Sequence, residues 1–242
     1  MAETTSYATD SDCEGEFFDA IDSRLRFLPT ELVQVILLYA TDAFSLKNLA
    51  QCCSSFHRAF LANQDSILQI VLRNEISADV LPDALVTFAS ARLLLGVDFK
   101  ILPCVPHEER DYLRDLRQIA ELGPVSWSMP KALAISKLHR DVDFFASEFA
   151  ATLTTSPIIS ITSNGSKALK PKEIERIERS FYRYELFCNL LRKGDLDTED
   201  KCRQFFNKFA PWENEQLASV YEYLFGTLST GMVSLNIWCT KD

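Results

Sequence analysis

One cysteine–histidine pair is spaced so that its two side chains can act together. Cys53 and His57 lie four residues apart on a predicted helix, which places both on one face. Such a pair can ligate a metal ion or act as a thiol nucleophile and its base. The neighbouring Cys52 makes no C-x-x-C motif with Cys53, and no second ligand pair has zinc-site spacing. We therefore expect a buried thiol beside a surface histidine, with no metal, cofactor or catalytic residue.

The acidic residues show no catalytic pairing either. Glu108 and Glu109, and the set Glu173, Glu175 and Glu178, alternate with Lys and Arg along predicted helices. Charges in that arrangement usually form i,i+4 pairs on a solvated helix face. The sequence also lacks a glycine-rich phosphate loop, a G-x-S-x-G turn and an H-E-x-x-H helix. We therefore expect a protein that is not an enzyme.

Composition favours helices and argues against several functional classes. Of the 242 residues, 47% are hydrophobic and only 7 are Gly and 9 are Pro, which disfavours a turn-rich β fold. The net charge is −9 and no basic patch contains interleaved aromatic residues, so we expect no nucleic-acid partner. Seven scattered cysteines, an acidic N-terminus and the lack of a long apolar run predict a cytoplasmic or nuclear protein without a membrane partner.

The pattern of the sequence divides the chain into four parts. Residues 1–24 predict a disordered acidic arm, because they hold few groups that could offset the entropy of ordering. Residues 26–75 predict three closely spaced helices, and residues 76–228 predict a helical C-terminal domain. Residues 229–242 predict an irregular tail that suggests a shortened C-terminus. The predicted fold is all-α, with a three-helix unit followed by an irregular multi-helix domain.

Apolar residues at helical spacing locate the individual elements. The expected helices cover residues 28–39, 43–60, 66–76, 82–95, 108–122, about 130–153, 171–193 and a segment that begins at Pro211. Asp65 is the expected N-cap of the third helix. In the last helix, Leu217, Val220, Tyr221 and Leu224 share one side. Residues 154–171 predict a loop, with a short strand near residues 158–161.

The helix predicted at residues 28–39 carries more aliphatic side chains than one buried face can hold. Seven of them fall within eleven positions: Leu28, Leu32, Val33, Val35, Ile36, Leu37 and Leu38. One face of an amphipathic helix buries about half of such a set. Each aliphatic side chain contributes about 1.5–3 kcal/mol when buried, so four or five uncovered ones make a costly exposed patch. We therefore expect this helix to contact its own small core and also a groove of a partner protein.

The same segment, over residues 26–72, resembles an F-box. The family's Leu-Pro-x-Glu-Leu opening is present at residues 28–32, followed by its Ile-Leu pair at Ile36 and Leu37. The second helix of the family is matched by Leu46, Leu49, Cys52, Cys53 and Phe56, with Cys52 in place of the usual Val.

A second segment resembles the C-terminal helices of F-box proteins from filamentous fungi. An aromatic-rich stretch at residues 176–191 precedes residues 205–225, which contain Pro-Trp-Glu-x-Glu-Gln-Leu at residues 211–217. Without the resemblance, the aromatic residues of this region are expected to be ordinary core side chains. These residues are Phe181, Tyr182, Tyr184, Phe187 and Trp212.

The resemblance implies a non-catalytic substrate receptor. F-box proteins dock on a small adaptor protein of a cullin–RING (SCF-type) ubiquitin ligase and bring a protein substrate close to it. The docking segment would be residues 28–56, with an unknown substrate bound by the C-terminal domain. The implied adaptor contacts and their supports are Leu28, Pro29, Leu32, Ile36, Leu49, Cys53 and Phe56, with Leu32 and Ile36 as anchors. Two alternatives remain open: a helical scaffold without a ligase, and a thiol-dependent enzyme that uses Cys53 and His57.

Overall fold

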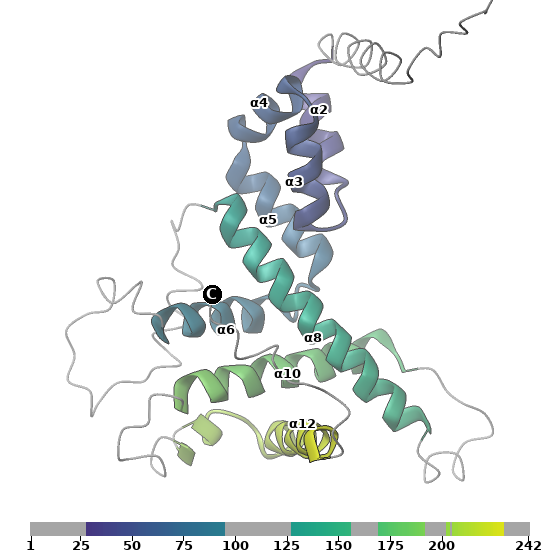
Figure 1. The fold of residues 1–242 in the computed structure, drawn as a ribbon, viewed down its shortest axis with the longest axis vertical. Helices are drawn as coiled ribbons and strands as arrows, with labels where there is room; N and C mark the ends of the chain where they lie inside the picture. The colour runs from purple at the N-terminus through teal and green to yellow at the C-terminus, as the bar shows by residue number, and fades with distance from the viewer. Residues whose placement is uncertain (1–27, 95–126, 156–168, 192–201, 204, 230–242) are drawn as a thin grey trace, which may run out of the picture. The chain divides into compact units, whose positions relative to one another are not determined.

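The computed structural model describes residues 28–94, 127–155, 169–191, 202–203 and 205–229 (Figure 1). Every regular element in these ranges is an α-helix, so the all-α prediction is confirmed for the part of the chain that is described. The acidic arm, the predicted helix at residues 108–122, the strand near residues 158–161 and the tail after residue 229 lie outside the described residues.

The described helices belong to two compact units. The first contains α2 (Thr30–Leu38), α3 (Ala43–Cys52), α4 (Ser54–Ala62), α5 (Gln64–Glu75) and the beginning of α8 (Met129–Thr155) as far as Ser136. The second contains α6 (Leu81–Leu94), the remainder of α8, α10 (Pro171–Leu191) and α12 (Pro211–Ser229). The sequence pattern does not predict that α8 contributes to the first unit.

The first unit has four described helices before residue 76, where the sequence predicts three. The chain leaves helical geometry at Cys53, whose backbone is extended with φ −157° and ψ 166°. The segment predicted as one helix over residues 43–60 is therefore two helices, α3 and α4. The next helix, α5, begins at Gln64, so Asp65 lies in its first turn and is not its N-cap. There its carboxylate still favours the positive end of the helix dipole.

Two carboxylates hold the start of α3. Asp42 is its N-cap and accepts hydrogen bonds from the backbone N–H groups of Phe44 (2.8 Å) and Ser45 (2.9 Å). Burial alone would raise the pKa of Asp42, but its hydrogen bonds, those from Ser45 foremost, outweigh burial and lower it. Glu75, at the end of α5, accepts hydrogen bonds from the backbone N–H of Ala43 (3.2 Å) and from the hydroxyl of Ser136.

The core of the first unit is formed by α2, α3, α4 and α5, which cluster together in Figure 1. Val33 and Leu37 of α2 are buried, as are the predicted core residues Leu68, Val71 and Leu72 of α5. Burial of these aliphatic side chains is the main driving force that fixes α2 against its neighbours.

The second unit is organised around α10, which packs against α6 and α12. In Figure 1, α12 is seen nearly end-on while α10 lies across the view, so the two helices cross at a steep angle. Aromatic rings fill much of the core: Phe145 of α8 lies 6.3 Å from Phe181 of α10, and Phe149 lies 5.1 Å from Tyr223 of α12, measured between ring centroids. The aromatic-rich segments are therefore largely core, as expected for Phe181 and Tyr182.

Three predictions for the second unit are wrong. Glu178, expected on a solvated face, is only 8% exposed. Trp212, expected in the core, is exposed, and Tyr221 is exposed although it was placed with the buried side of α12. Both aromatic residues lie outside the buried stripe of α12, which consists of Leu217, Val220 and Leu224.

A buried arginine joins three segments of the second unit. The Nε group of Arg183 donates to Asp83 of α6 (3.2 Å), and its Nη1 group donates to Glu213 of α12 (2.7 Å). The guanidinium carbon also lies 4.8 Å from the centre of the Phe209 ring. This side chain therefore satisfies two carboxylates and covers an aromatic ring at once.

Candidate protein-docking surface

Helix α2 buries one apolar face and exposes another. Leu32, Val35, Ile36 and Tyr39 are 51%, 46%, 40% and 81% exposed. These residues stand at positions i, i+3, i+4 and i+7, which lie next to one another on a helix surface. Tyr39 follows the last residue of α2 and keeps right-handed helical backbone angles, so the row continues past the helix end. We call these four residues the α2 stripe.

The local structure holds the α2 stripe in place. The backbone N–H groups of Leu32 and Val33 donate to the carbonyl of Pro29, which begins the helix. On α2, the Gln34 side chain donates to the carbonyl of Ala59 in α4 (3.1 Å). Together with the buried Val33 and Leu37, these bonds fix the rotation of α2 about its axis. The exposed face is therefore presented on a preformed helix.

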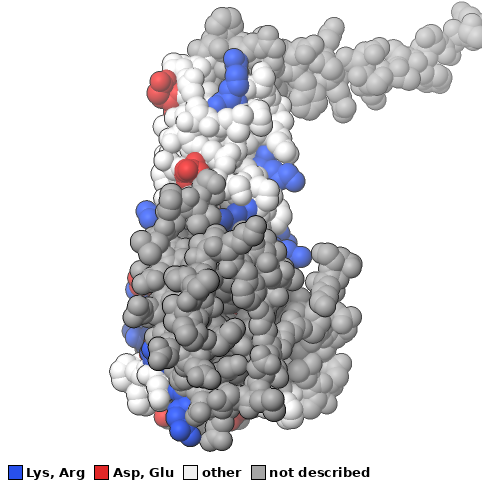
Figure 2. Space-filling view, turned by 90° about the vertical axis from the view of Figure 1, so that its left-hand side faces the viewer, with Lys and Arg blue, Asp and Glu red and all other residues white. Residues whose placement is uncertain are grey.

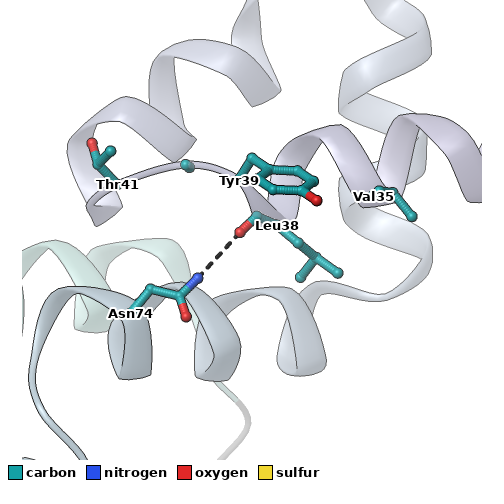
Figure 3. Close-up of a pocket in the computed structure, with 6 residues that line it drawn as sticks. Val35, Leu38, Tyr39, Thr41 and Asn74 are labelled. Atoms are coloured by element: carbon teal, nitrogen blue, oxygen red, sulfur yellow. Dashed lines mark hydrogen bonds between the residues drawn. The ribbon is translucent and has the colours of Figure 1, made fainter.

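An open groove of about 500 Å³ adjoins the C-terminal end of the stripe (Figure 3). It is lined by Val35, Leu38, Tyr39, Ala40, Thr41 and Asn74. The side-chain amide of Asn74 donates to the backbone carbonyl of Leu38 (3.2 Å), which ties α5 to the end of α2. Since Val35 and Tyr39 belong to both features, the stripe and the groove form one continuous surface.

The predicted adaptor contacts differ in how accessible they are. Leu32 and Ile36, the predicted anchors, both lie on the exposed stripe, and Pro29 is exposed just before it. Three of the predicted contacts are half-buried: Leu28, Leu49 and Cys53. Phe56 is buried in the core. Phe56 can therefore support the surface but cannot contact a partner directly. The prediction omitted Val35 and Tyr39. Their i+3 and i+7 spacing from Leu32 is the signal that would have identified them.

The surface has little charge of its own. The α2 helix carries a single charged residue, Glu31, in its first turn. On the face drawn in Figure 2, the described Lys and Arg side chains are spread apart and do not form a continuous basic patch. Because α2 itself has only this one charged residue, Glu31, recognition at the α2 stripe would depend on apolar contact more than on charge.

The cysteine–histidine pair has a different setting. Cys53 is half-buried at the α3–α4 junction, while His57 is exposed on α4. Burial, and next the neighbouring Cys53, raise the pKa of the Cys52 thiol, which favours its protonated and less nucleophilic form. Within the described ranges, no group of three or more His, Cys, Asp or Glu side chains is arranged to hold a metal ion.

Comparisons with family models, with curated proteins and with solved structures give no match to this chain. The F-box assignment therefore stays a prediction that depends on the motif residues and on the α2 stripe. Among the helices of the described residues, none combines the length and apolar character needed to cross a membrane.

Proposed function

We propose that the first unit docks on the small adaptor protein of an SCF-type, cullin–RING ubiquitin ligase, and that the chain is a non-catalytic F-box substrate receptor. The observation that carries the proposal is the α2 stripe. It lies in the segment whose Leu-Pro-x-Glu-Leu opening resembles an F-box. The motif and the stripe share Leu32 and Ile36, but the motif depends on residue identity, whereas the exposure of the stripe depends on packing.

The size of the stripe fits a docking anchor. Its three aliphatic side chains are about half exposed, so their complete burial would add roughly 2–4 kcal/mol at about 1.5–3 kcal/mol per fully buried side chain. Tyr39 adds an amphipathic ring of the kind that is enriched at binding hot spots. A micromolar complex needs about 8 kcal/mol. The exposed Pro29 and the half-buried Leu49 and Cys53 are the neighbouring residues that would supply more contact.

The second unit would then hold the substrate. In this arrangement the chain supplies no reactive group and acts by raising the effective concentration of a bound protein near the ligase. The scattered cysteines favour the cytoplasm or nucleus as the compartment. The identity of the substrate is a separate question from docking.

Co-purification of the full chain with the co-expressed adaptor tests the proposal. The wild-type chain is expected to retain the adaptor, and the Leu32→Asp, Ile36→Asp double variant is expected to lose it. Both positions are exposed, so circular dichroism should show the same helix content for both proteins.

A well-folded wild-type chain that fails to retain the adaptor would overturn the proposal. Retention of the adaptor by the folded double variant would show that docking occurs away from the α2 stripe. In either case the F-box interpretation of α2 is lost.

A further inference from the structure

The second unit exposes a row of aromatic rings. Tyr221 and Phe225 lie four residues apart on α12, are 53% and 59% exposed, and stack with ring centroids 6.0 Å apart and an interplanar angle of 23°. Tyr184 of α10 continues the row, with its ring centroid 6.4 Å from that of Tyr221. We call these three residues the aromatic row.

Tyr221 and Phe225 are not needed to complete the core of their unit, whereas Tyr184 is half-buried and packs against the edge of that core. The buried side of α12 is formed by Leu217, Val220 and Leu224, so the rings of Tyr221 and Phe225 lie beside the core. Burial, and next the neighbouring Cys188, raise the pKa of Tyr184 to about 12, so its phenol stays neutral under physiological conditions. The row therefore presents uncharged aromatic faces.

A carboxylate borders these rings, and α12 has no basic side chain. Along its 19 residues, α12 carries Glu213, Glu215 and Glu222 but neither Lys nor Arg. Glu213 is held by Arg183, whereas Glu215 and Glu222 are exposed. Glu222 lies three residues before Phe225 and so borders the aromatic row on the helix surface. Glu215 lies seven residues before Glu222, two turns further along the same side of α12, where a second basic residue of an extended ligand could reach it.

Aromatic faces beside carboxylates are complementary to an Arg or Lys side chain. The cation is attracted to the ring face, and its N–H groups can donate to a nearby carboxylate. An acidic segment would instead meet like charge, which disfavours binding.

We propose that the aromatic row, with Glu215 and Glu222, is a docking surface for a basic linear peptide segment of a partner protein. An Arg or Lys side chain lies over Tyr221 and Phe225 and is paired with a bordering carboxylate. Apolar neighbours in the peptide pack against the ring edges. This inference is independent of adaptor docking by the first unit, since it concerns a different surface and a different ligand.

Fluorescence anisotropy with the full chain tests the inference directly. The probe is a short fluorescein-labelled peptide of alternating arginine and leucine, and the reference peptide has glutamate in place of arginine. The arginine peptide is expected to bind and the glutamate peptide is not. Binding should weaken as the salt concentration rises, because exposed charges are screened.

Two double variants separate the contributions of rings and carboxylates. The double variant Tyr221→Ala, Phe225→Ala should bind the peptide about fivefold or more weakly than wild type. The double variant Glu215→Gln, Glu222→Gln should bind it about threefold more weakly. Two controls are matched to them. Phe144→Ala removes another exposed aromatic side chain, and Glu31→Gln with Asp65→Asn removes two exposed carboxylates elsewhere.

Both controls are expected to change the affinity by less than about twofold. If the Glu31→Gln, Asp65→Asn control loses as much affinity as the Glu215→Gln, Glu222→Gln variant, the peptide responds only to the net charge of the chain. That result would overturn the inference. Unchanged binding by the ring variant, or no binding by the wild-type chain, would also overturn it. So would self-association of the wild-type chain that disappears in the ring variant, because the occupant would then be a second copy.

Discussion

The buried carboxyl of Glu178 makes the stability of the second unit depend on pH near neutrality. Burial, and then the nearby carboxylates of Asp143 on α8 and Glu175 on α10, raise the pKa of Glu178 from its ordinary 4.5 to about 7. Lys172, a cation on the same helix, is engaged with Glu175 (2.9 Å) and Asp79. Ionisation of Glu178 therefore places a third negative charge among two others at the α8–α10 contact.

The sign of the effect follows from this raised pKa. The folded chain binds the Glu178 proton more tightly than the unfolded chain, so the free energy of unfolding falls as the pH rises from about 4.5 through about 7. One pKa unit corresponds to about 1.4 kcal/mol, so the full loss is up to about 3 kcal/mol. A glutamine has nearly the same shape and no charge. We expect Glu178→Gln to stabilise the chain by about 1–3 kcal/mol near pH 8 and by almost nothing near pH 4.5.

Urea unfolding of the full chain, followed by circular dichroism, measures this difference. Wild type and Glu178→Gln are compared near pH 4.5 and near pH 8, with Glu148→Gln, which replaces an exposed glutamate on α8, as the matched control. The control should change the free energy of unfolding by less than about 0.5 kcal/mol at either pH. A Glu178→Gln variant that gains nothing near pH 8, or that gains equally at both pH values, would refute the reasoning.

Three further predictions concern the described contacts. Asp42→Ala should destabilise the first unit by about 1 kcal/mol, because α3 loses its N-cap. Because the pKa of Asp42 is lowered in the folded chain, this advantage of wild type should disappear as the pH falls below about 4. Measuring the free energy of unfolding of both proteins at a series of acidic pH values checks this. Arg183→Met leaves Glu213 without this cation and removes the shorter of the two arginine contacts of Asp83, which keeps Arg179 at 3.7 Å. This variant should cost about 2–4 kcal/mol in urea unfolding, a loss that Arg183→Lys does not fully restore. Leu37→Ala should lower the free energy of unfolding by about 2–4 kcal/mol, whereas Leu32→Ala should change it by less than about 0.5 kcal/mol, and equal losses would contradict the two-faced description of α2.

The sequence predicts the long helices well because their buried faces repeat at helical spacing. The helices at 82–95, at about 130–153, at 171–193 and from Pro211 correspond to α6, α8, α10 and α12 within a few residues. The break at Cys53 was missed, because no Gly or Pro marks it and the apolar pattern continues across it. The role of α8 in the first unit is a long-range packing effect, which local periodicity does not report.

The burial of Glu178 was missed for a different reason. It lies four residues after Ile174 and three before Phe181, so spacing alone places it on the apolar side of α10. The prediction instead gave more weight to the negative charge of Glu178 and placed it on a solvated helix face. In the same way, the motif directed attention to Leu32 and Ile36, while the exposure of Tyr39 depends on how α2 packs.

The central claim is that the α2 stripe docks on the ligase adaptor, and a matched pair of substitutions tests it most directly. Ile36 on α2 and Ile70 on α5 are the same residue type, both helical, and 40% and 39% exposed. The dissociation constant of the purified adaptor is measured by calorimetry for wild type, Ile36→Asp and Ile70→Asp, each checked by circular dichroism. We predict a loss of about 30-fold or more for Ile36→Asp, as expected for a hot-spot residue of about 2 kcal/mol, and less than about threefold for Ile70→Asp. Equal affinities for the two variants, or no adaptor binding by the folded wild-type chain, would contradict the account.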